Sequence, residues 1–121
     1  MGKTTWSYEV ETRAVIRALR KLGYDLDRVD YENGWGEVEG SEKITLKPSQ
    51  VEKAVRAIGA VDASHLYVKT PAGQSLFFYL IAGNSPGELV ADYQIPRSRA
   101  ERKPLDDAIR SVSDKFYGKA R

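Results

Sequence analysis

The fold of this chain is decided by residues 64–95, which read SHLYVKTPAGQSLFFYLIAGNSPGELVADYQI. Apolar runs alternate with the turn-forming sequences Pro71-Ala72-Gly73-Gln74 and Asn84-Ser85-Pro86-Gly87, which predicts strands at roughly 64–70, 75–82 and 88–95. Connections this short join antiparallel neighbours, so we expect a three-stranded meander.

The middle strand of this meander is apolar at odd and even positions alike, from Leu76 to Ile81. This pattern predicts a central strand that is covered on both faces. Two arrangements would provide the cover. Helices could lie on one face and a loop or hairpin on the other, or the second face could be buried in a homodimer.

Helices are expected on both sides of this stretch. An apolar stripe at helical spacing predicts a helix over Ser7–Leu22, which Gly23 ends with Tyr24 packing back on its last turn. The capping-box pattern Ser49-Gln50-Val51-Glu52 begins a short second helix, which Gly59 ends. The third helix is expected to start at Pro104 and to end at Gly118.

A β-hairpin is expected between the first two helices. Asn33-Gly34 is the preferred pair for a two-residue turn, and folding the chain there pairs Val29 with Val38. Ile44 and Leu46 could add a short third strand. The element order is then α-β-β-α-β-β-β-α. It predicts one α+β domain over residues 1–121, with an antiparallel sheet of about five strands and three helices.

Composition places the chain among globular intracellular proteins. Of its 121 residues, 41% are hydrophobic and 30% are charged, which argues against disorder. The absence of cysteine excludes disulfides, thiolate zinc sites and cysteine nucleophiles. No signal peptide and no apolar run long enough to span a bilayer are evident, so we expect a cytoplasmic protein without a membrane partner.

Acidic residues gather on the predicted hairpin. In its register the outer face carries Arg28 and a group that we interpret as a protein-binding site: Asp30, Glu32, Trp35, Glu37 and Glu39. Tryptophan is enriched at binding hot spots, and the acids favour a basic partner. The alternative interpretation is a solvated outer face with a partly packed tryptophan.

A basic segment offers a second candidate surface. Arg97, Arg99, Arg102 and Lys103 lie between the last strand and the last helix, and the net charge of the whole chain is +2. Such a linker could contact the phosphates of a nucleic acid, although it has no interleaved aromatic residues and no nucleic-acid-binding motif. We therefore expect nucleic-acid affinity that is weak, independent of sequence and steeply dependent on salt.

Catalytic and metal-binding patterns are not found in the sequence. Gly2-Lys3-Thr4 lacks the preceding glycine and strand of a P-loop. Asp25, Asp27 and Asp30 do not have the spacing of a calcium loop. The one histidine, His65, has no cysteine to join it in a metal site. We expect no catalytic residue, no metal and no cofactor.

The segment Gly83–Tyr93, a turn and a strand followed by a C-terminal helix, resembles a pattern of small uncharacterised phage and prophage proteins. The resemblance covers only the last third of the chain and implies no activity. It implies a context in which short proteins act by binding host factors. The sequence therefore favours a non-enzymatic interaction module, with a nucleic-acid-binding protein as the alternative.

The predicted hairpin register makes Trp35 an exposed residue. It shares a face with Glu37 and Glu39 and lies opposite Glu32, and unpaired carboxylates are not buried in a core. We expect Trp35→Ala to leave the free energy of unfolding, measured by chemical denaturation, nearly unchanged. A loss of about 3 kcal/mol, as when a core aromatic side chain is removed, would make Trp35 a structural residue.

Overall fold

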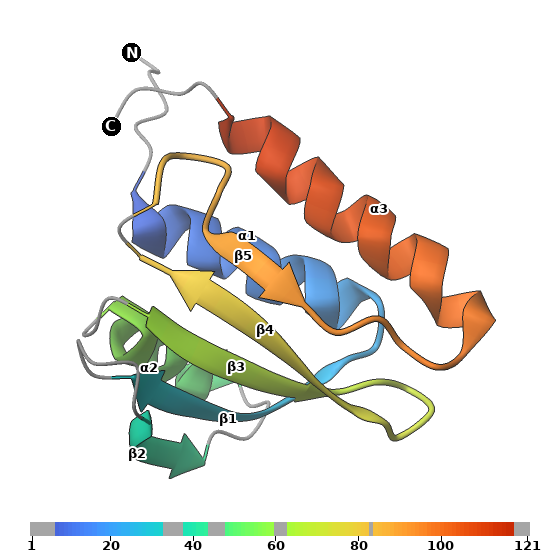
Figure 1. The fold of residues 1–121 in the computed structure, drawn as a ribbon, viewed down its shortest axis with the longest axis horizontal. Helices are drawn as coiled ribbons and strands as arrows, with labels where there is room; N and C mark the ends of the chain where they lie inside the picture. Colours follow the sequence, from blue (N-terminus) through green and yellow to red (C-terminus); the bar gives the residue numbers. More distant parts are fainter. Residues whose placement is uncertain (1–6, 33–37, 44–47, 60–62, 83, 118–121) are drawn as a thin grey trace.

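The computed structural model describes residues 7–32, 38–43, 48–59, 63–82 and 84–117. The elements are α1 (Tyr8–Lys21), β1 (Asp25–Glu32), β2 (Val38–Lys43), α2 (Pro48–Gly59), β3 (Ala63–Lys69), β4 (Ser75–Ile81), β5 (Val90–Tyr93) and α3 (Arg99–Phe116). The strands lie in the order β2-β1-β3-β4-β5, and each pairs antiparallel with its neighbours (Figure 1). The α+β class, the helices and the antiparallel sheet are confirmed, and the predicted element order fits.

The helices gather on one side of the sheet. In Figure 1, α1 and α2 lie behind the strands, and α3 lies beside α1 near β5. The core between them is built from alternate strand residues, such as Leu66 and Phe78, and from helix residues such as Leu19 and Leu105, all of which are fully buried. None of the described helices is long and apolar enough to cross a membrane.

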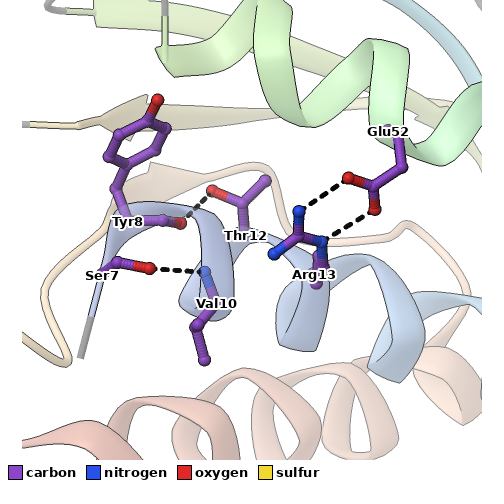
Figure 2. A network of polar contacts seen from close by, with 6 residues as sticks. All are labelled: Ser7, Tyr8, Val10, Thr12, Arg13 and Glu52. Atoms are coloured by element: carbon purple, nitrogen blue, oxygen red, sulfur yellow. Dashed lines mark hydrogen bonds and ion pairs between the residues drawn. The ribbon is translucent and has the colours of Figure 1, made fainter. Parts of the chain in front are cut away.

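Both ends of α1 follow local sequence rules. The Ser7 hydroxyl accepts a hydrogen bond from the Val10 N–H at 3.2 Å, and so caps the first turn (Figure 2). At the other end Gly23 has a φ of +86°, and the Tyr24 N–H donates to the Leu19 carbonyl at 3.0 Å. This is the predicted Schellman end, and it directs the chain from α1 into β1.

A bidentate ion pair joins α1 to α2. The Arg13 guanidinium donates to both carboxylate oxygens of Glu52, at 2.7 and 2.6 Å (Figure 2). This hydrogen bond, together with the positive charge of Arg13, lowers the pKa of Glu52 below its usual range. Because both side chains are exposed, the pair orients the two helices more than it stabilises them.

The connection between β4 and β5 is clamped by helices on both sides. The carboxylate of Glu11, in α1, is almost completely buried and accepts the N–H groups of Gly87 at 2.9 Å and Leu89 at 3.1 Å. From α3, the Ser113 hydroxyl donates to the Gly87 carbonyl. The connection is thereby fixed between α1 and α3, and β5 is positioned along β4.

A second contact ties β5 to α3. The Tyr93 hydroxyl donates to Asp106 at 2.6 Å, and the Tyr93 ring stacks on Phe78 with 5.5 Å between ring centroids. Burial, followed by the hydrogen bond and the negative charge of Asp106, raises the pKa of Tyr93 to about 12. The hydroxyl therefore remains a donor at neutral pH.

The predicted hairpin exists, but its register was wrong. Glu32 pairs with Val38, and Val29 pairs with Glu42 instead of Val38. A β-bulge lies between Tyr31 and Glu32. A turn preference acts locally, whereas β1 is also held by an extended ladder with β3 up to Glu32. Asn33-Gly34, Ile44 and Leu46 lie outside the described residues.

The predicted start of the last helix was also wrong. The helix begins at Arg99 after the N-cap Ser98, so that Pro104 lies inside it. Pro104 has no N–H to donate to the carbonyl of Ala100. The side chain of Arg102 instead makes hydrogen bonds at the helix start, to the carbonyls of Pro96 at 2.8 Å and Arg97 at 3.0 Å. Gly118 lies outside the described residues.

Gly87 and Gly73 provide a matched test of how closely α3 packs against the connection between β4 and β5. Both have a positive φ, of +85° and +88° respectively. A Cβ on Gly73 would meet nothing within 4 Å, whereas one on Gly87 would lie 2.7 Å from the Ser113 carbonyl oxygen. We expect Gly73→Ala to cost about 1–2 kcal/mol for the left-handed backbone alone.

Gly87→Ala is expected to cost about 1–3 kcal/mol more than Gly73→Ala, because the α3 backbone must move to accept the methyl group. Urea denaturation of the two variants and the parent measures the difference. Equal losses of unfolding free energy for the two variants would mean that the connection between β4 and β5 does not pack closely against α3.

Candidate functional site

One face of the sheet has no described helix or strand lying over it. Alternate strand residues point away from the helices and have intermediate or high exposure, except that Asp30 is buried. We call this surface the uncovered face and define it by Arg28, Asp30, His65, Tyr67, Phe77, Tyr79 and Asp92. The predicted cover on both faces of the middle strand is therefore not present in the part of the chain that the structure describes.

Strand register arranges these residues in two rows across the sheet. One row runs through Arg28, Tyr67 and Phe77. The next runs through Asp30, His65, Tyr79 and Asp92. Side chains directly opposite each other on one face of antiparallel strands lie within contact distance, so each row is a continuous strip of side chains.

Four rings form the centre of the uncovered face. The His65 ring lies 4.9 Å from Tyr79 and 5.5 Å from Phe77, measured between centroids. The rings of Tyr67 and Phe77 are 6.3 Å apart. Distances of this size are typical of interacting aromatic pairs. Each ring keeps part of its surface exposed, so the cluster offers an amphipathic contact area held by rigid strands.

Arg28 contacts both the four-ring cluster and the carboxylate of Asp30. Its guanidinium carbon lies 3.9 Å from the centroid of the Tyr67 ring, a cation–π contact, and its Nε donates to Asp30 at 3.2 Å. Burial by itself would lower the pKa of Arg28, but the hydrogen bond and negative charge of Asp30 outweigh burial and raise it. Arg28 therefore stays charged and compensates the buried carboxylate of Asp30.

The predicted acidic site is only partly brought together. Asp30 was expected to face water, but it is buried beside Arg28, because an ion pair permits a burial that a lone carboxylate would not. Glu32 ends β1, and Glu39 lies in β2. Trp35 and Glu37 lie outside the described residues. The pairing of Glu32 with Val38 removes the register argument for the position of Trp35.

The predicted basic linker is mostly helix. Arg99, Arg102 and Lys103 belong to the first turns of α3, while Arg97 precedes them. The Arg102 guanidinium is bound to the carbonyls of Pro96 and Arg97, and Lys103 pairs with Asp107 at 3.0 Å. Two of the four cations therefore have partners within the protein, which weakens the case for a phosphate-binding strip.

The aromatic part of the uncovered face was missed by sequence reasoning. His65, Tyr67, Phe77 and Tyr79 all occupy odd-numbered positions on either side of the Pro71–Gln74 turn. Pairing of Lys69 with Ser75 across that turn places them on one face. The alternation within residues 63–69, with apolar residues at the even positions 66 and 68, was the available signal.

Binding is the chemistry that this arrangement supports best. Aromatic rings and an arginine held on strands provide large contact area with little loss of side-chain entropy. Among the described residues, no group of three or more histidine, cysteine, aspartate and glutamate side chains could hold a metal ion. No protein-family model, curated protein or solved structure matches the chain, and the resemblance to phage proteins stays a prediction.

Phe77 and Phe78 test which face is the core. They are neighbours in β4, but Phe78 is fully buried and Phe77 is partly exposed. We expect Phe78→Ala to lower the free energy of unfolding by about 3–5 kcal/mol. Phe77→Ala is expected to lower it by about 1–2 kcal/mol, because part of its ring surface already contacts water.

Chemical denaturation of both variants measures the two losses. Both substitutions replace phenylalanine by alanine at neighbouring positions of β4. The difference between the two losses therefore reports which face of the sheet each side chain occupies. Similar losses at the two positions would mean that another part of the chain covers the uncovered face.

Proposed function

We propose that this protein is a non-catalytic interaction module that binds a basic protein segment on its uncovered face. The observation that supports the proposal is the juxtaposition of the four-ring cluster with the exposed Asp92, which lies opposite Tyr79 on the same face of the sheet. Rings attract cations through their faces, and carboxylates pair with them. A segment rich in lysine and arginine meets both requirements.

The charge of the uncovered face favours such a partner. The described strand residues that register places on this face, with the bulge residue Asp27, include the acids Asp25, Asp27, Asp30, Glu32 and Asp92 against Arg28, Lys43 and Lys69, a net of −2. Of the other predicted acids, Glu39 lies in the adjoining strand β2, and Glu37 lies outside the described residues. A negative surface speeds the approach of a basic partner and repels the phosphates of a nucleic acid.

Nucleic acid is the second candidate partner, and one observation favours it. Rings on an open sheet face can stack on the bases of a single strand. Arg28 occupies one face of the Tyr67 ring, however, and leaves less ring surface for a base. The basic residues of the alternative site, Arg97, Arg99, Arg102 and Lys103, belong to the start of α3 rather than to the strands.

A titration monitored by NMR tests the proposal with three defined probes. The first is a synthetic peptide in which lysine and arginine alternate with leucine. The second is the same peptide with glutamate at every basic position, and the third is a single-stranded oligothymidylate. We expect the basic peptide alone to give saturable shifts at His65, Tyr67, Phe77 and Tyr79 at physiological salt.

Two variants locate the binding. Phe77→Ala is expected to weaken binding of the basic peptide by about 2 kcal/mol or more, as hot-spot truncations do. Tyr117→Ala removes an aromatic side chain that is 68% exposed at the end of α3, and it should leave the affinity unchanged. Tight binding of the oligothymidylate, or equal binding of the acidic peptide, would contradict the proposal.

A further inference from the structure

A pocket of about 330 Å³ lies on the helix side of the molecule, apart from the uncovered face. It lies between the C-terminal end of α1, the turn between β3 and β4, and the first turns of α3. Leu22, Pro71 and Pro104 give it apolar walls, and Lys21, Tyr24 and Glu101 supply its polar groups. A cavity of this size holds a small organic molecule.

Two polar atoms of this pocket are buried without a partner. Tyr24 is only 3% exposed, and its hydroxyl makes no hydrogen bond with any described residue. The same is true of one carboxylate oxygen of Glu101, Oε1. Buried polar groups are nearly always paired, and an unpaired carboxylate oxygen is the costliest kind. Both atoms therefore indicate an occupant that carries hydrogen-bond donors.

The chemistry of the two atoms selects a cationic group. An ionised carboxylate can only accept hydrogen bonds, and a phenol can accept as well as donate. Burial and then the negative charge of Glu101 raise the pKa of Tyr24, so its hydroxyl is not ionised at neutral pH. An ammonium or guanidinium group has several N–H donors and can satisfy both atoms while neutralising Glu101.

Lys21 and the apolar walls of the pocket limit the charge and the shape of its occupant. Lys21 is exposed, so water screens its charge from a singly charged occupant, but this charge disfavours an occupant that carries two positive charges. The apolar side chains of Leu22, Pro71 and Pro104 suit a short alkyl stem. We propose that this pocket binds a small organic monocation, with an ammonium or guanidinium group between Tyr24 Oη and Glu101 Oε1 and its alkyl stem against the apolar walls.

Isothermal titration and NMR of the full chain test this with four probes of equal stem length. These are n-butylammonium, n-butylguanidinium, n-butanol and pentanoate, each with an n-butyl stem. We expect saturable binding of one or both cations, with amide shifts at 21–24 and 100–103. The alcohol and the carboxylate should bind at least about tenfold more weakly, because neither supplies a charge-assisted hydrogen bond.

Glu101→Gln keeps the size of the side chain and removes its charge, so it should lower the affinity for the cation about tenfold or more. Glu88→Gln is the matched control, because Glu88 is exposed and is not part of the pocket. Tyr24→Phe removes the second unpaired atom and should also lower the affinity for the cation. It provides an independent test if Glu101→Gln does not fold, as judged by circular dichroism.

Three results would overturn the proposal. One is the absence of saturable shifts with either cation at millimolar concentrations, which would leave water as the occupant. Another is binding of n-butanol as tight as that of n-butylammonium. The third is unchanged affinity in both Glu101→Gln and Tyr24→Phe. Because the probes and the variants differ from those used for the uncovered face, this inference can fail without affecting the proposed function.

Discussion

The buried carboxylate of Glu11 is the contact on which the layered arrangement depends. It accepts two N–H groups from the connection between β4 and β5, at Gly87 and Leu89, and so links α1 to the edge of the sheet. A buried carboxylate is tolerated because hydrogen bonds replace its lost hydration. Ser113 closes the same connection from α3. With the connection held, β5 pairs with β4, and Tyr93 reaches Asp106 on α3.

One-sided layering explains why the sheet has an aromatic surface. The described helices all contribute to a single core, so the alternate strand positions on that side are buried, and on the other side Asp30 alone of the residues that define the uncovered face is buried. The opposite positions include histidine, tyrosine and phenylalanine, residues whose rings cover one another in part. Rings in tilted and edge-on contact shield each other from water in part and leave area for a partner. Arg28 and Asp30 extend the surface toward β1 with a compensated pair of charges.

The parts of the fold that local rules govern were predicted from the sequence, and the parts set by distant contacts were not. The Ser7–Leu22 helix, its Gly23 end and the meander at 64–95 rest on neighbouring residues, and they were found. The hairpin register was missed because the β1–β3 ladder and a bulge determine it together. The position of Arg28 in the site was missed for a similar reason, since no local pattern shows that Arg28 lies opposite Tyr67. At α3, the Ser98–Glu101 spacing of a capping box was a local signal that Pro104 obscured.

The clamp on Gly87 also constrains the order of events during synthesis. Its contact with Glu11 joins residues 76 positions apart, and its contact with Ser113 reaches a further 26 positions along the chain. A nascent chain can form α1 and the β3–β4 hairpin early, from contacts between near neighbours. The groups that enclose Gly87 meet only after α3 has left the ribosome. Docking of α3 is therefore a late step in the folding of this domain, and until then the connection is held from the α1 side alone.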